Sequence, residues 1–153
     1  MGNPVDRFWK DFVAIQPHYA QHPQPVVGYF GDSPEMAERL GSLVLKGQKT
    51  ATCTALAFYA ADGEPLPTVG GLEIILDGQD KPWLIIKTTE VTVCKFIEVD
   101  ARFAFDEGEG DRSLEYWRSA HWNYFARTLP TIGLEPSEGM ELMCQRFVKI
   151  YPM

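Results

Sequence analysis

"KGQKTATCTAL", residues 46–56, marks the point where the chain changes from a helical to an extended pattern. Ahead of it, Ser33-Pro34-Glu35 is a typical helix start, and the apolar stripe that follows predicts a helix ending at Gly47. Beyond Gly47, threonines alternate with small apolar residues, which favours a short strand. This helix-to-strand junction decides the fold, and it carries Lys49, Thr50 and Thr52.

The rest of the chain combines a few helices with several strands. Three β-branched or alternating segments predict antiparallel strands, at residues 72–78, 82–96 and 142–151. Asn3-Pro4 predicts an N-terminal helix, Ser113 predicts the start of a long helix, and the proline-rich residues 16–34 predict an irregular connection. The fold class is therefore α+β, with a small curled sheet or β-barrel surrounded by helices.

Composition limits the partners and the compartment. The 153 residues fit one domain, and the net charge of −7 is unfavourable for broad contact with a phosphate backbone. A local pocket for a short single-stranded RNA, a nucleoside or a nucleotide remains open. Three widely separated cysteines suggest neither a disulfide framework nor a zinc site, and no apolar run is long enough for a membrane span. We expect a cytoplasmic protein; the sequence gives no oligomeric state.

The segments "GQKTATC", "EGEGDRSLEYWRSAHWNYF" and "MCQRF", followed by "IYP", resemble the ASCH domain family over residues 28–152. The resemblance implies a β-barrel related to the PUA fold, ringed by helices. It also implies a cleft in which the G-x-K-T-x-T motif faces RNA or a nucleoside. We therefore expect residues 28–153 to form the ASCH domain, with residues 1–27 as a helical extension packed on it.

The resemblance also implies roles for residues of the junction. Lys49 matches the motif lysine, Thr52 matches the threonine that acts as nucleophile in amidohydrolases of the family, and Thr50 is their structural partner. Short members resemble amidohydrolases that deacetylate N4-acetylcytidine, whereas longer members include a ribonuclease. Thr54 stands where the strict motif often has an arginine, which weakens the amidohydrolase alternative. Gly71 and Gln145 also differ from residues that are frequent in the family.

Lys49 admits a structural and a catalytic interpretation. A lysine at the end of a helix can simply complement the negative end of the helix dipole. An ammonium beside a threonine can instead hold the hydroxyl oxygen, lose its proton more readily, or stabilise an oxyanion. The catalytic interpretation requires Lys49 to lie in the turn, because in a strand it would point away from Thr50 and Thr52.

The acidic stretch "DEGEGD", residues 106–111, supplies candidate bases. Glu109 or Glu107 can act as a general base opposite Lys49, and the two glycines allow close approach of the backbone to a ligand. The alternative is a set of solvated carboxylates that complement the dipole at a helix start. The spacing does not match a calcium loop, so no cofactor is predicted, although a divalent ion is possible.

Further candidates for ligand binding flank this stretch. Ser113 is a helix cap that can also donate to a phosphate, and Arg112 can contact the same anion. Trp117 and His121 share an apolar helix face, which suits either a core pair or a base-stacking platform with a catalytic acid.

Other candidates lie outside that helix. Tyr59, like Tyr29 and Trp122, can stack on a base. Arg146 falls on an otherwise apolar strand face and needs an anion or a cleft carboxylate as its partner.

Three functions remain open from the sequence. The first is a small ribonuclease that cleaves single-stranded RNA, in which Lys49 neutralises the phosphate and an acidic residue removes a proton. The second is an amidohydrolase on N4-acetylcytidine-type nucleosides, in which Thr52 attacks the amide, Lys49 activates it and Glu109 moves the proton. The third is a non-catalytic module that binds RNA or a nucleotide.

Overall fold

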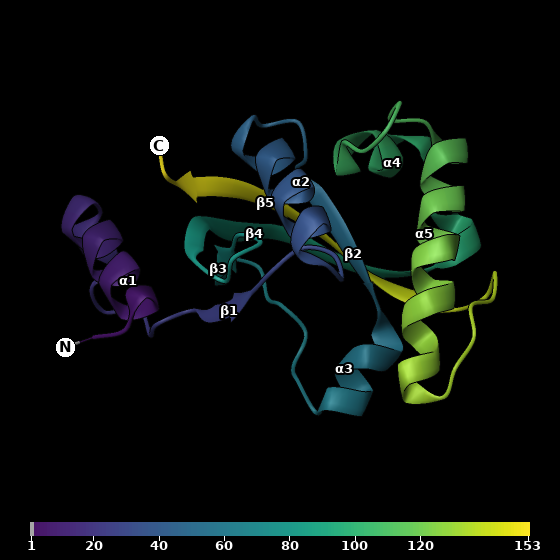
Figure 1. Ribbon diagram of the computed structural model, residues 1–153, viewed down its shortest axis with the longest axis horizontal. Helices are drawn as coiled ribbons and strands as arrows, with labels where there is room; N and C mark the ends of the chain where they lie inside the picture. Colours follow the sequence, from purple (N-terminus) through teal and green to yellow (C-terminus); the bar gives the residue numbers. More distant parts are fainter. Residues whose placement is uncertain (1) are drawn as a thin grey trace.

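One five-stranded sheet forms the centre of the protein and curls into a half-barrel (Figure 1). The computed structural model describes residues 2–153. The strands follow the spatial order β1-β3-β4-β5-β2. Their bounds are β1 Val26–Gly28, β2 Ala51–Ala55, β3 Leu72–Leu76, β4 Pro82–Lys95 and β5 Glu141–Tyr151. The predicted α+β class with a curled sheet is confirmed.

The curl follows from the long central strands. β4 pairs with β3 through its first half and with β5 along nearly all of its length. Its register with β5 shifts between Ile85 and Ile86 and again between Thr88 and Glu90. Such bulges bend a strand and increase its twist, so two in one pair curl the sheet.

In residues 2–153, five α-helices surround the sheet. They are α1 Pro4–Ile15, α2 Pro34–Leu45, α3 Leu56–Asp62, α4 Ala101–Glu107 and α5 Leu114–Thr128. Short 3-10 helices lie at Pro17–Tyr19, Phe96–Glu98 and Leu129–Ile132. Asn3, Ser33 and Ser113 cap α1, α2 and α5 through side-chain oxygens, as the sequence predicted. Within residues 2–153, no helix has the length and hydropathy that a membrane span requires.

The two faces of β3 are covered by different helices. Ile74 packs with Trp9 and Phe12 of α1, whereas its neighbour Ile75 packs with Leu40 of α2. Successive side chains of a strand point to opposite faces, so the apolar residues at these two positions are buried on both faces of β3. A third cluster joins Trp117 and Phe125 of α5 to β2 and β5, and α5 thus closes the far side of the sheet from α1 (Figure 1).

Three features differ from the sequence predictions. The supposed irregular connection contains β1, which pairs with β3 in parallel although only antiparallel pairing was predicted. The seven-residue helices α3 and α4 were not predicted, because two turns carry little periodicity. As a result, Asp106 and Glu107 end α4 and do not precede a helix, so the dipole argument does not apply to them.

Candidate active site

A cleft of about 360 Å³ lies between the sheet, α2 and α5. Its walls come from segments far apart in the sequence, including β2, β3, β5, the α4–α5 loop and α5. Seven of the candidate residues from the sequence line it, namely Tyr29, Lys49, Thr52, Tyr59, Glu107, Glu109 and His121. This volume is within the range of small-molecule sites.

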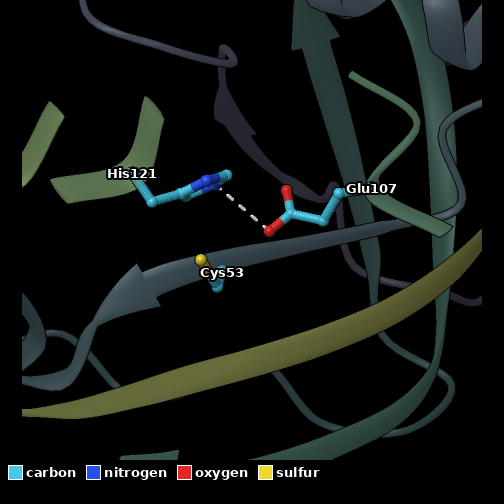
Figure 2. A group of neighbouring side chains, drawn as sticks. All are labelled: Cys53, Glu107 and His121. Atoms are coloured by element: carbon cyan, nitrogen blue, oxygen red, sulfur yellow. Dashed lines mark ion pairs between the residues drawn. The ribbon is translucent and has the colours of Figure 1, made fainter. Parts of the chain in front are cut away.

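Glu107 is the central anion of the cleft and is only 1% exposed. Its Oε2 accepts a hydrogen bond from Trp117 Nε1 at 2.7 Å. The same oxygen lies 3.2 Å from His121 Nε2 (Figure 2). Its Oε1 accepts from Lys49 Nζ at 2.8 Å. Burial alone would raise the pKa of Glu107, but the charges of Lys49 and His121 outweigh it and lower that pKa. Glu107 is therefore a fixed carboxylate that orients its neighbours, and it is unsuited to act as a base.

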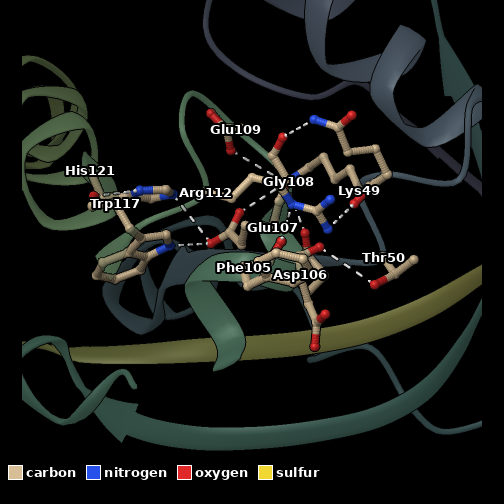
Figure 3. A network of polar contacts seen from close by, with 12 residues as sticks. Lys49, Thr50, Phe105, Asp106, Glu107, Gly108, Glu109, Arg112, Trp117 and His121 are labelled. Atoms are coloured by element: carbon tan, nitrogen blue, oxygen red, sulfur yellow. Dashed lines mark hydrogen bonds and ion pairs between the residues drawn. The ribbon is translucent and has the colours of Figure 1, made fainter. Parts of the chain in front are cut away.

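Lys49 reaches back into the cleft from the turn that precedes β2 (Figure 3). Gly47 has a φ of 80°, which ends the helical path, and the amides of Gln48 and Lys49 both donate to the Leu43 carbonyl. Besides Glu107, Nζ contacts the Ala51 carbonyl at 2.8 Å and Glu109 Oε2 at 3.4 Å. The turn position that the catalytic interpretation required is thus present.

The Lys49 ammonium keeps its proton. Burial by itself lowers the pKa of a lysine, but the facing carboxylates of Glu107 and Glu109 outweigh it, so the pKa of Lys49 is raised. A proton-accepting lysine, one of the sequence-based alternatives, does not fit this environment. Lys49 is suited to stabilise negative charge that develops beside it.

His121 is held as an imidazolium. Its Nδ1 lies 2.9 Å from the Trp117 carbonyl oxygen, and its Nε2 faces the Glu107 carboxylate. Both partners are acceptors, so each ring nitrogen must carry a hydrogen to satisfy them. Burial opposes the charge, yet Glu107 raises the pKa of His121 above its ordinary value. The ring also stacks on Trp117, with centroids 4.2 Å apart.

We expect Glu107→Gln to lower the pKa of His121, because the anion that favours the imidazolium is lost. The measurement is a pH titration of the His121 ring signals by NMR, with Glu135→Gln, at an exposed position, as control. The ion pair of His121 with Glu107 also contributes to stability. Because the folded-state pKa of His121 is raised, this contribution is complete below the unfolded pKa of about 6.5 and disappears as pH rises through the folded pKa. An unchanged His121 titration in Glu107→Gln would contradict the assignment.

Glu109 is the accessible carboxylate of the group, with 11% of its side chain exposed. It lies in the α4–α5 loop between Gly108 and Gly110, both with positive φ. A Cβ on Gly108 would lie 2.6 Å from the Gln48 carbonyl oxygen, and one on Gly110 would lie 2.5 Å from the Tyr116 ring. The glycines therefore allow close packing within the protein, where the sequence suggested close approach to a ligand.

The other six candidates do not line this cleft; Trp122 packs against the core cluster of α5, and several of the rest support the residues that line it. Thr50 donates from its amide to the Asp106 carbonyl at 2.8 Å and thereby ties β2 to α4. Arg112 donates to the Phe105 carbonyl and lies 3.6 Å above the Phe105 ring. Ser113 caps α5, as described above. Trp117 is buried and reaches the cleft only through its hydrogen bond to Glu107.

Arg146 lies on the other face of β5. It pairs with Asp106 and Glu90 and lines a separate cavity of about 240 Å³. The predicted carboxylate partner is therefore present, but it does not belong to the Lys49 cleft.

The cleft also contains residues that the sequence analysis did not select. Glu73 from β3 and Gln145 from β5 line its floor, and Arg39 and Arg127 line it from α2 and α5. Arg127 forms an ion pair with Asp32 at 2.7 Å. A carboxylate inside the apolar strand "LEIIL" was a sequence signal for Glu73.

Cys53, Glu107 and His121 offer metal-ligand atoms within 4.8 Å of one another (Figure 2). Cysteine, carboxylate and histidine are a plausible ligand set for zinc. Here, however, burial raises the pKa of Cys53 well above its ordinary value, and Lys49 already occupies Glu107. To bind here, a metal ion would have to displace the thiol proton of Cys53, the Nε2 proton of His121 and the Lys49 ammonium beside Glu107.

Comparison with known proteins identifies the family. The ASCH domain family model matches residues 27–151. The crystal structure of a protein from Enterococcus faecalis V583, assigned to DUF984, is 40% identical with a TM-score of 0.88, covering 96% of this chain and 88% of that one. An ASCH domain from Lactobacillus crispatus JV V101 is 31% identical with a TM-score of 0.89, covering 99% and 96%. No curated protein matches the sequence. The chain belongs to the ASCH domain family.

Proposed function

We propose that the cleft is the active site of a small ribonuclease that cleaves single-stranded RNA. The observation that carries this proposal is the meeting of Glu109, Lys49 and His121 in one cleft. Phosphodiester cleavage by a neighbouring 2′-hydroxyl needs a base, a cation and an acid. Glu109 is the accessible carboxylate, Lys49 is a fixed cation, and His121 carries two N–H groups.

In this mechanism Glu109 removes the proton of the ribose 2′-hydroxyl. The 2′-oxygen then forms a bond to the adjacent phosphorus, and the bond from phosphorus to the 5′-oxygen breaks. Lys49 stabilises the added negative charge. The Nε2 proton of His121, which otherwise faces Glu107, passes to the leaving 5′-oxygen. The products are a 2′,3′-cyclic phosphate and a 5′-hydroxyl end. The proton taken up by Glu109 then passes through water to His121, which restores the starting charge of Glu109 and His121.

The charge distribution supports a short, single-stranded substrate. The chain carries a net charge of −7, which opposes contact with a long phosphate backbone. Arg39 lines the cleft, and among residues 2–153 it forms no ion pair, so it is available to one phosphate. Tyr29 also lines the cleft and is 58% exposed, which suits stacking on a base. The three free cysteines suit the cytoplasm, where such a substrate is found.

A second candidate is an amidohydrolase on N4-acetylcytidine-type nucleosides. Two observations favour it. Thr52 lines the same cleft, and the Lys49 charge is already balanced by Glu107, so the cleft suits an uncharged amide substrate. Thr52 Oγ1 would bond to the acyl carbon while Glu109 passes the hydroxyl proton to the leaving amine. Water would then release the acyl group. A purely binding module would use the same residues without either reaction.

One set of incubations separates these functions. The wild-type protein is incubated with four substrates, with and without a divalent ion, and the products are followed by mass spectrometry. The substrates are a short RNA, a chimera that has the same sequence in DNA with a single ribonucleotide, the corresponding all-DNA strand, and N4-acetylcytidine. A ribonuclease cuts the RNA and cuts the chimera only after its ribonucleotide, leaving a cyclic phosphate. Acetate with cytidine would support the amidohydrolase instead. If wild-type protein transforms none of them, both catalytic proposals fail and the binding module stands.

A further inference from the structure

A row of polar side chains crosses the sheet at the floor of the cleft. Gln145 of β5 is directly opposite Thr52 of β2, and it donates to Thr88 Oγ1 of β4 at 2.8 Å. It also donates to Glu73 Oε1 of β3 at 3.1 Å. Thr88 and Gln145 are 2% and 3% exposed, and Ile75 and Ile86 lie beside them in the cleft wall. A carboxylate and an amide on otherwise apolar strands are unfavourable unless they are paired, and here Gln145 meets that need by bonding to both Thr88 and Glu73. Glu73 and Gln145 also line the cleft, so they can contact a ligand.

The hydrogen bonds fix the orientation of the Gln145 amide. Both hydrogens of Nε2 are used, one by Thr88 and one by Glu73. If the amide were flipped, its oxygen would face the Glu73 carboxylate, and two hydrogen-bond acceptors would then repel each other. In the chain from residue 2 onward, Gln145 Oε1 and Glu73 Oε2 receive no hydrogen bond. Gln145 Oε1 and Glu73 Oε2 can therefore both accept hydrogen bonds from a ligand in the cleft.

We propose that Glu73 and Gln145 form a guanine-recognition subsite in this cleft, an inference that rests on the proposed nucleotide-binding role of the cleft. Guanine is the common base whose Watson–Crick edge presents two adjacent donors, N1–H and N2–H₂. Adenine and cytosine place a ring-nitrogen acceptor beside their amino group, and uracil places one N–H between two carbonyls. Single-stranded bases are commonly read on this edge.

The wrong base is rejected because it displaces water from the Glu73 and Gln145 acceptors without donating hydrogen bonds in return. A site built for hydrogen-bond donors discriminates strongly against ligands that lack them. The polar row also sets the direction of the substrate. With the base at Glu73, the ribose and phosphate extend along the row toward Thr52 and Lys49. Cleavage by the proposed ribonuclease then follows a guanosine.

Binding of nucleoside 3′-monophosphates tests the subsite directly. Calorimetry at pH 8, well above the ordinary pKa of a carboxyl group, compares GMP, IMP, AMP, CMP and UMP with wild-type protein. IMP differs from GMP only in lacking the N2 amino group. One bidentate contact discriminates by about 1–3 kcal/mol, so GMP should bind roughly tenfold or more tightly than the other four. Equal binding of GMP and IMP, preference for another base, or no binding would overturn the proposal.

Glu73→Gln replaces an acceptor by a donor at nearly constant size. It should weaken GMP binding about tenfold and abolish the preference over IMP. Glu64→Gln, at an exposed position, is the matched control and should change neither. GMP binding that is unaffected by Glu73→Gln would overturn the assignment, and the wild-type comparison of GMP with IMP decides the matter if this variant does not fold.

The two proposals fail in different ways. Selective GMP binding without RNA cleavage would refute the ribonuclease and leave the guanine subsite. Cleavage without preference for guanosine, unchanged in Glu73→Gln, would leave the ribonuclease and refute the subsite.

Discussion

Lys49→Met should lower the free energy of unfolding by about 3–5 kcal/mol. The substitution keeps an apolar stem of similar length but removes the ammonium that lies 2.8 Å from Glu107. Glu107 is 1% exposed, so its charge would remain buried with His121 as its only cationic partner among the described residues. Removing one member of a buried ion pair is costly because the remaining charge cannot reach water. Urea unfolding, followed by tryptophan fluorescence, measures the change.

Two further variants identify the cause of this loss. Lys46→Met removes an exposed lysine three residues away and should change stability by less than about 0.5 kcal/mol. The double variant Lys49→Met/Glu107→Gln removes both charges, while the amide oxygen of the introduced glutamine can still accept from Trp117. It should recover a large part of the stability lost in Lys49→Met. A double variant as unstable as the sum of the two single variants would show that the charges are not coupled.

The fold was largely predictable because its strongest signals are local. Capping residues and apolar stripes located α1, α2 and α5, and β-branched runs located β2 to β5. β1 was missed because a three-residue strand has no measurable alternation, and its parallel pairing with β3 depends on contacts 47 residues apart, Val26 with Glu73. The bulges in β4 that curl the sheet also have no sequence signal of their own.

Lys49, Thr52 and Glu109 share one cleft, and the roles that the sequence analysis gave them stay predictions. The sequence could not separate Glu107 from Glu109, because their difference lies in partners and not in residue type. Glu107 is occupied by Lys49, Trp117 and His121, whereas Glu109 has one long contact at 3.4 Å. Two acidic residues two positions apart in a glycine-rich loop look equivalent until the chain is folded.

Glu109→Gln should reduce the rate of RNA cleavage by about 10²–10⁴-fold, the usual contribution of a general base. The amide keeps the size of the side chain but cannot accept a proton at neutral pH. Stability should change by less than about 1 kcal/mol, because Glu109 is partly exposed and its contact with Lys49 is long. The measurement is the single-turnover rate on the chimeric oligonucleotide together with urea unfolding.

Asp111→Asn is the matched control for Glu109→Gln, because Asp111 is an exposed carboxylate of the same loop. Its side chain accepts from the Ser113 amide at 2.9 Å, and an asparagine oxygen can do the same. Asp111→Asn should therefore retain both stability and rate. Glu107→Gln, in contrast, should lower stability, because the Lys49 ammonium then keeps only the longer contact with the Glu109 carboxylate. Wild-type rates in a folded Glu109→Gln variant would remove Glu109 from the mechanism and require a different base in the cleft.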